Sequence, residues 1–521
     1  MLKVRYDKRI VNESRDYARK ISYDIYQRFI KGFSTDTIER TTLRFLGIEG
    51  SNEGGFPLVN AVVDRIKESD RIGEGVLNHI AREMAVSGTD FYGAVKIIAD
   101  GNLSSMKPSL TSLEKAKTDI RTIANKRMDE LRKRRKEREA FRQSFEPQPA
   151  PLKYLIVATG NIYDDVVQSQ AAAEAGADII AVIRSTAQSL LDYVPEGATT
   201  EGYGGTYATQ ENFRIMRSAL DESSKKLNRY IYLTNYSSGL CMPEIAYLGA
   251  YEGLDVLLND AMYGILFRDI NMKRTFCDQF FSRMICATSQ IIINTGEDNY
   301  LTTSDAVERA HTVLTSLFIN EAFAKLAGMK SEYMGLGHAF EINPQIEDSF
   351  VLELSQALLI RQIFPKSPIK YMPPTKHMTG DPFYSNLLDA MFNLASKLSD
   401  QHIHLLGMMT EAMHNPLMMD RYESLKNVNY IFNTVNSLKD QIVIKRDSLL
   451  NRRAEEVLNR AYNLLKKVSE VGLDKAISEG EFADIKRFCD SGKGLSGVYK
   501  MNEEYFNPVF DILMAKTGGE R

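Results

Sequence analysis

A segment near residue 185 carries side chains that suit an anionic ligand. Arg184, Ser185, Thr186 and Ser189 bring one guanidinium group and three hydroxyl groups into a short stretch of chain. Such groups bind phosphate well, because they combine a fixed positive charge with several hydrogen-bond donors. The spacing therefore predicts a phosphate site in this segment.

Other residues whose side chains could bind a ligand or take part in a reaction follow short apolar runs elsewhere in the chain. Tyr263 could stack on a planar ring, although a tyrosine of the protein core is an equally ordinary assignment. Taken singly, polar residues after an apolar run often cap a helix or shape a turn. Their concentration after consecutive runs favours a functional site instead. The set comprises Asn235, Ser238, Asn259, Arg268, Asn294, Asp298, Asn299, His338, Glu341, Lys370, Lys376 and Glu411.

Eight apolar runs are expected to position these side chains. They are rich in Ile, Val and Leu and show little alternation, which is typical of parallel strands buried on both faces. The runs are 154–160, 178–184, 230–236, 254–260, 290–296, 334–341, 368–374 and 402–408.

The stretches between the runs have helical patterns, as in 304–327. Eight strand–helix units in about 260 residues predict an α/β fold, a (β/α)₈ barrel of the TIM type, with its chemistry at the carboxyl ends of the strands. A doubly wound open sheet is the alternative. The barrel is favoured because the units number eight and no GxGxxG follows the first run.

The flanks of this region have a different character. We expect an N-terminal helical accessory region at 1–145, a proline-rich linker at 146–151, the barrel at 152–445 and a C-terminal helical accessory region at 446–521. Asp36 and Glu39 resemble a capping box at the start of one N-terminal helix.

Composition and charge argue against several classes of protein. A net charge of −3 and four cysteines without CxxC spacing give no sign of a nucleic-acid protein, a disulfide framework or a metal site. The basic run 126–138 is interpreted as a solvated helix end or a subunit contact rather than a nucleic-acid site. Without an apolar leader or membrane span, a cytoplasmic protein is expected.

Several long motifs resemble one known family. They are YLIVATGNIYDD (154–165), AVIRSTAQSLLDY (181–193), NDAMYGILFRDINM (259–272), IINTGEDNYLTT (292–303), KYMPPTKHMTG (370–380) and HLLGMMTEAMHNP (404–416). These stretches are similar to the α subunits of lysine 5,6-aminomutase, and the similarity covers nearly the whole chain.

The resemblance implies a radical isomerase that uses pyridoxal 5′-phosphate (PLP) and adenosylcobalamin. It would move the terminal amino group of D-lysine or L-β-lysine to the neighbouring carbon, in lysine fermentation. An α₂β₂ assembly is implied, in which the β subunit carries the cobalamin module and the lysine that binds PLP. From its own residues, this chain would nominate Lys370 or Lys376 for that lysine. The cobalt-ligand pattern DxHxxG has its nearest approach at 400–405, which ends in leucine.

The resemblance also implies roles for individual residues. Ser238 would face the pyridine nitrogen, Tyr263 would stack on the ring, and Arg268 and Asn299 would contact cofactor oxygens. The phosphate would be held by Arg184, Ser185, Thr186, Ala187, Gln188 and Ser189, with Tyr193 close by.

Three further residues would serve the reaction itself. Asp298 and Lys370 would bind the substrate's α-amino and carboxylate groups. Glu411 would lie near the substrate amine or the adenosine ribose, so that Tyr263 and Glu411 are the candidate catalytic residues.

Two other functions stay open. One is a related mutase that acts on another diamino acid, such as ornithine. The other is a non-catalytic subunit that only clamps a partner. The retained set Arg184, Ser238, Tyr263, Arg268 and Asp298 argues against the second, because a scaffold has no use for it.

Overall fold

All eight predicted runs form strands of one parallel sheet. The computed structural model describes residues 2–104, 106–183, 187–235, 239–259, 262–414 and 416–517. The sixth strand is in two pieces, β7 and β8, that flank Leu336. The strands are β2 (Leu152–Ile156), β3 (Ile179–Ile183), β4 (Tyr232–Asn235), β5 (Val256–Leu258), β6 (Ile292–Asn294), β7 (Met334–Gly335), β8 (Gly337–Ala339), β9 (Lys370–Met372) and β10 (Ile403–Leu405).

The sheet closes on itself. The last strand pairs in parallel with the first, with Ile403 opposite Leu152. The two pieces of the sixth strand complete the ring, because β7 pairs with β6 and β8 pairs with β9. The predicted TIM-type barrel is confirmed, and the alternative of an open doubly wound sheet is wrong.

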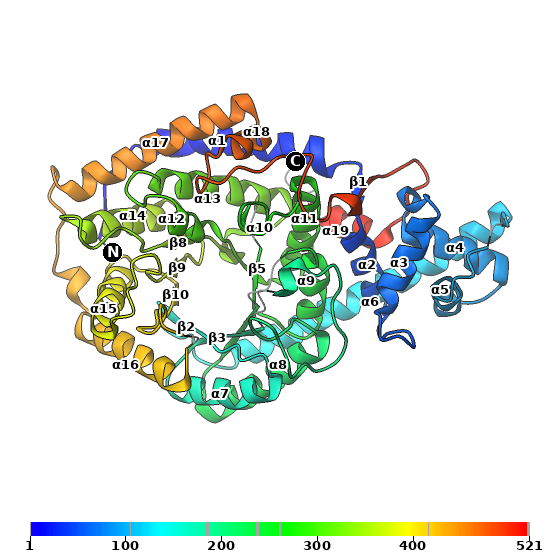
Figure 1. The fold of residues 1–521 in the computed structure, drawn as a ribbon, viewed down its shortest axis with the longest axis horizontal. Helices are drawn as coiled ribbons and strands as arrows, with labels where there is room; N and C mark the ends of the chain where they lie inside the picture. Colours follow the sequence, from blue (N-terminus) through cyan, green and yellow to red (C-terminus); the bar gives the residue numbers. More distant parts are fainter. Residues whose placement is uncertain are drawn as a thin grey trace.

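Helices surround the barrel (Figure 1). Buried, mainly aliphatic side chains from five strands, including Tyr154, Ile179 and Met372, form a separate cluster inside it. The helices of this region are α7 (Ile162–Glu174), α8 (Gln210–Leu227), α9 (Met242–Tyr251), α10 (Tyr263–Arg268), α11 (Met272–Ser289), α12 (Tyr300–Thr303), α13 (Ala310–Leu326), α14 (Ser349–Ile363), α15 (Pro382–Leu398) and α16 (Met418–Thr434).

The N-terminal region is helical, as expected, and most of it forms a lobe at one side of the barrel (Figure 1). The predicted capping box is wrong by one residue: Thr35 caps α2, and its side chain accepts a hydrogen bond from the backbone N–H of Ile38. The N-terminal helices are α1 (Lys8–Ile25), α2 (Asp36–Phe45), α3 (Leu58–Glu68), α4 (Val76–Ser87), α5 (Phe91–Ala99) and α6 (Leu110–Gln143).

Segments from the N-terminal and C-terminal parts of the chain pack against each other. A short strand β1 (Phe33–Thr35) pairs antiparallel with β11 (Val498–Lys500). The helix α17 (Leu449–Val471) packs along α1 over the outer face of the barrel (Figure 1). The remaining C-terminal helices are α18 (Leu473–Glu479) and α19 (Pro508–Thr517).

The basic run lies near the end of α6 and binds the barrel. Arg134 and Arg135 donate to the carbonyls of Tyr251 and Thr288. Arg138 holds both carboxylate oxygens of Asp221, at 2.9 and 2.8 Å. The expectation of a solvated helix end is therefore wrong for these arginines, which fasten the helix to the barrel.

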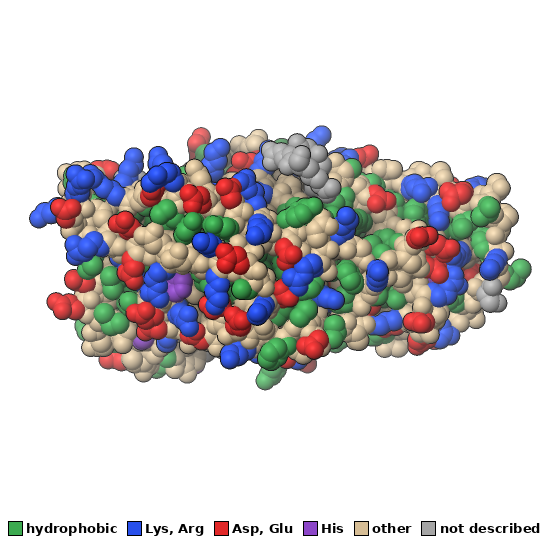
Figure 2. Space-filling model, turned by 90° about the horizontal axis from the view of Figure 1, so that it is seen from above, with side chains coloured by type: hydrophobic (Ala, Val, Ile, Leu, Met, Phe, Trp, Pro, Cys, Tyr) green, Lys and Arg blue, Asp and Glu red, His purple; other side chains and the backbone are tan. Residues whose placement is uncertain are grey.

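One face of the molecule is of mixed charge. On the face seen in Figure 2, acidic and basic side chains alternate over short distances. Within the described residues, no helix combines the length and the apolar character that a membrane crossing requires.

Candidate functional site

A cavity of about 880 Å³ lies at the carboxyl ends of the strands. Its lining comes largely from the segments that follow six different strands. Tyr263 follows β5, Asn299 follows β6 and Glu411 follows β10, and all three line this one cavity. Three of the residues singled out in the sequence are thus brought together.

Tyr263 and Arg268 sit at opposite ends of α10, the short helix that follows β5. Arg268 donates a hydrogen bond of 3.3 Å from its Nη2 to the Tyr263 hydroxyl. The Tyr263 ring stacks against Phe267, with 5.2 Å between the ring centroids. These contacts fix the tyrosine ring at the cavity wall and place a guanidinium group beside it.

Asp298 and Lys370 form a fully buried ion pair behind Asn299. The distance from Lys370 Nζ to Asp298 Oδ2 is 2.5 Å, and neither side chain is exposed. Asn299 Nδ2 donates to the other carboxylate oxygen at 2.7 Å. Burial raises the pKa of Asp298, and the Lys370 ammonium opposes that rise. Neither side chain lines the cavity, but Asp298 directly precedes Asn299, which does.

The predicted phosphate segment is described only from residue 187 onward. Arg184, Ser185 and Thr186 lie outside the described residues, as does Ser238, and Ala187 is described only as backbone.

The described part of this segment is held in place by its own contacts. The Gln188 carboxamide donates to the Ala208 carbonyl and accepts from the Ala208 N–H, so it anchors the segment to residue 208. Ser189 is buried, and Tyr193 is 37% exposed.

The cavity also has polar walls that the sequence did not single out. Arg421 and Gln168 both line it and are hydrogen-bonded to each other. Arg421 Nε also donates to the carbonyl of Ile156 at 3.0 Å. Arg421 lies in the first turns of α16, the helix that follows the last strand. Its position could have been predicted, because the helix that follows a barrel strand begins at the edge where the site lies.

The buried carboxyl group of Glu341 holds the loop after β9, which contributes Thr375 to the cavity lining. Glu341 accepts hydrogen bonds from the Thr375 hydroxyl, at 2.5 Å, and from the Lys376 N–H, at 3.0 Å. Burial raises the pKa of Glu341 to about 7. The two predicted polar residues Glu341 and Lys376 therefore meet at the loop after β9.

The histidine of the incomplete cobalt-ligand pattern lies away from the cavity. His402 directly precedes β10, at the amino end of the barrel, and its Nε2 is 3.3 Å from the guanidinium of Arg361. Burial and Arg361 lower its pKa to about 4. Among the described residues, no group of three or more His, Cys, Asp or Glu side chains is placed to hold a metal ion.

Comparisons with known proteins agree with this architecture. A family model described as the D-lysine 5,6-aminomutase TIM-barrel domain of the alpha subunit matches residues 4–512. The lysine 5,6-aminomutase alpha subunit of Acetoanaerobium sticklandii is 50% identical over 514 residues, 99% of each chain. That of Fusobacterium nucleatum is 51% identical over 522 residues, the full length of both.

A more distant relative is also an aminomutase. The D-ornithine 4,5-aminomutase subunit beta of Acetoanaerobium sticklandii is 28% identical over 378 residues, which are 70% of this chain and 51% of that protein. The full-length matches and the barrel agree on one assignment. The chain belongs to the family of lysine 5,6-aminomutase alpha subunits.

Proposed function

We propose that this chain is the PLP-binding catalytic subunit of an adenosylcobalamin-dependent lysine 5,6-aminomutase. The reaction moves the terminal amino group of D-lysine or L-β-lysine to C5 and gives 2,5- or 3,5-diaminohexanoate. The observation that carries the proposal is the convergence of Tyr263, Asn299 and Glu411 on one cavity. A buried pair of opposite charges, Asp298 and Lys370, lies directly beside it.

The described residues fit PLP in size and chemistry. A cavity of about 880 Å³ is within the ~300–1,000 Å³ range of small-molecule sites. Tyr263 offers a ring for stacking, and Arg268 and Asn299 offer donors for cofactor oxygens. When bound, PLP supplies a π bond to the migrating nitrogen, and adenosylcobalamin supplies a carbon radical.

The chain's own side chains bind and orient the substrate. Lysine carries an ammonium and a carboxylate group on its α-carbon, which match Asp298 and Lys370 in charge. Exchange of the buried ion pair for contacts to the substrate fixes one end of lysine by two opposite charges. The other end, with the migrating amine, then points along the cavity toward Glu411 and Tyr263.

A partner subunit is part of the proposal. The sequence has no DxHxxG pattern, and His402 lies at the amino end of the barrel. These features support a cobalamin module on a β subunit. The family resemblance also assigns to that subunit the lysine that anchors PLP, in an α₂β₂ enzyme. The pathway is lysine fermentation in the cytoplasm.

Product analysis of the reconstituted complex tests the proposal. The chain is co-expressed with its β subunit, supplied with PLP, adenosylcobalamin and either D-lysine or L-β-lysine, and the diaminohexanoate products are identified by mass spectrometry. Formation of these products is the expected result. An assembled complex with both cofactors bound and no product would contradict it.

The match to an ornithine aminomutase subunit supports a second candidate substrate. D-ornithine is shorter than lysine by one methylene group, so the same complex is assayed with both amino acids in parallel. A higher kcat/KM for lysine is expected.

A further inference from the structure

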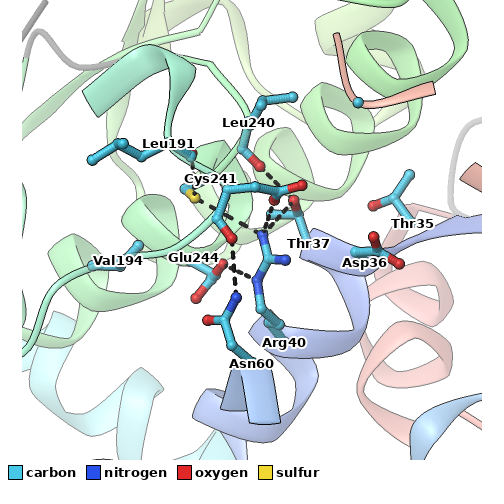
Figure 3. A network of polar contacts seen from close by, with 12 residues as sticks. Thr35, Asp36, Thr37, Arg40, Asn60, Leu191, Val194, Leu240, Cys241 and Glu244 are labelled. Atoms are coloured by element: carbon cyan, nitrogen blue, oxygen red, sulfur yellow. Dashed lines mark hydrogen bonds and ion pairs between the residues drawn. The ribbon is translucent and has the colours of Figure 1, made fainter. Parts of the chain in front are cut away.

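A buried network joins the N-terminal lobe to the two segments that adjoin the proposed PLP contacts (Figure 3). We call this network the arginine clamp. Its members come from α2, from the loop after β3, from the segment after β4 and from α11. They are Thr37, Arg40, Arg44, Asp192, Glu244, Arg274 and Asp278.

The clamp holds the loop after β3 through Asp192. Arg40 Nη2 and Arg274 Nη2 lie 2.5 and 2.9 Å from the same carboxylate oxygen. The backbone carbonyl of Asp192 accepts a hydrogen bond of 3.0 Å from Asn60 of α3. Burial alone would raise the pKa of Asp192, but the two guanidinium groups outweigh it and lower that pKa to about 2. Asp192 is therefore ionised throughout the neutral range.

The clamp holds the segment after β4 through the Leu240 carbonyl. This oxygen accepts from the Thr37 hydroxyl and from Arg274 Nη2, the latter at 3.2 Å. Leu240 is two residues from Ser238, and Asp192 is six residues from Thr186. Asp192 directly precedes Tyr193, so each anchor lies within two residues of a position that the family resemblance assigns to PLP.

The two held segments also touch each other. The Leu240 N–H donates to the Ser189 carbonyl at 3.3 Å. A Cβ at residue 239 would lie 2.0 Å from that same carbonyl, and Gly239 has a φ of +135°. Only glycine allows this approach. A shift of either segment would therefore displace the other.

Every charge of the clamp is paired, and all except Asp192, whose side chain is 38% exposed, are buried. Glu244 bridges Arg40 and Arg44, at 2.7 and 2.8 Å, and is not exposed at all. Arg274 is equally buried and also pairs with Asp278 at 2.8 Å. Buried ion pairs of this kind contribute little net stability, but they specify one arrangement when every charge is satisfied.

The clamp cannot contact the cofactor directly. None of its described members lines the cavity. The described residues of the segments 187–192 and 239–244 do not line it either, so the clamp can affect PLP only through the position of these segments.

We propose that Asp192 and Thr37 are positioning residues for PLP, through which the N-terminal lobe sets the geometry of the phosphate segment and of the residues next to Ser238. The inference rests on the proposed function. It predicts that damage to the clamp weakens PLP binding in a complex that remains folded.

The test compares PLP affinity in matched variants of the complex with the β subunit. Thr37→Val keeps the shape but removes the hydroxyl, which donates to the Leu240 carbonyl and accepts from Arg40 and Arg274. Thr37→Ser retains this hydroxyl. Asp192→Asn removes one charge of the clamp. Asp474→Asn is the control, because Asp474 forms a surface ion pair with Arg28, at 2.6 Å, outside the clamp. The Kd for PLP is measured by absorbance titration, together with Tm and with kcat at saturating PLP.

The expected result is a rise of the Kd by about tenfold or more in Thr37→Val and Asp192→Asn, as for loss of a charge-assisted contact that preorganises a site. Thr37→Ser and Asp474→Asn should match the wild type, and saturating PLP should restore most of kcat. A lower Tm at unchanged Kd in Thr37→Val would overturn the inference. If Asp192→Asn does not fold, the Thr37 pair decides alone. Failure of the wild-type complex to bind PLP would instead overturn the proposed function.

Discussion

The ion pair between Asp298 and Lys370 is closed off from water, although it adjoins the proposed substrate site. In this setting each charge depends on the other, because an isolated buried charge is costly. The pair can open only toward a ligand that supplies both complementary charges, as an amino acid does. The selectivity for zwitterions is thus proposed to begin at this pair.

Replacement of both partners should cost less than the sum of the two single replacements. Asp298→Asn and Lys370→Met are each expected to lower the free energy of unfolding by roughly 3–5 kcal/mol, as for breaking a buried pair. The double variant should lose less than the sum, since it leaves no uncompensated charge. Urea unfolding of the four proteins gives this cycle. Additive losses would mean that the two side chains do not depend on each other.

Glu353 in α14 should make stability depend on pH. Burial raises its pKa to about 8, even though the Ile342 N–H donates to it. In the unfolded chain a glutamate titrates near pH 4.3, so between these values the unfolded state binds fewer protons. Stability should therefore fall as the pH rises from about 4.3 to about 8 and then level off.

The matched variant for this effect is Glu353→Gln, which keeps the shape and the acceptor oxygen. Its Tm relative to the wild type should increase between pH 6 and pH 8.5, measured by calorimetry. Glu455→Gln, at an exposed position, is the control and should give a constant difference. Parallel curves for all three proteins would rule out an ionisable Glu353 with a raised pKa.

At the scale of elements, the C-terminal half of α6 is hydrogen-bonded to the helices that surround the barrel. Arg138 is well buried and holds Asp221 of α8, while Lys133 on the same helix is 78% exposed. Arg138→Ala should lower the free energy of unfolding by about 1–3 kcal/mol, the worth of a partly buried charge-assisted pair. Lys133→Ala should stay within about 0.5 kcal/mol of the wild type. Equal effects in urea unfolding would mean that these contacts contribute nothing specific.

The elements differ in how well the sequence predicts them. The eight strands were predictable, because strands buried on both faces need continuous apolar runs, such as Ile291–Ile293. The convergence of Tyr263, Asn299 and Glu411 followed from the barrel, since all three come after strands. The basic run was misjudged because its partners, such as Asp221 and the Thr288 carbonyl, are distant in sequence.

The arginine clamp had no local signal either. Arg40 and Glu244 are 204 residues apart, and each one alone has the pattern of a surface residue on a helix. Arg421 was not predictable from the strand ends, because it lies in α16, the helix that follows the last strand. Pairings of distant charges are set by the tertiary fold and not by a periodic pattern.

At the scale of the whole molecule, N-terminal and C-terminal segments pack together against the barrel, as α1 and α17 do (Figure 1). The strand β11 pairs with β1, which directly precedes α2 and hence the arginine clamp. A truncated chain that lacks residues 491–521, and so lacks β11, should therefore have the backbone of 33–35 exposed and α2 less firmly held. Hydrogen exchange at these residues should become faster, while peptides from β2 and β3 should keep their protection. Unchanged exchange at 33–35 would show that β11 is dispensable.

The central claim is that the cavity at the strand ends of this chain holds PLP. The most direct measurement is a crystal structure of the complex with the β subunit, PLP and a lysine analogue. We predict electron density for the pyridine ring stacked on Tyr263, with the ring centroids about 4.5–7 Å apart, and the analogue's α-carboxylate and α-amino groups on Lys370 and Asp298. Density for PLP away from Tyr263, with the Asp298–Lys370 pair still closed, would contradict the account.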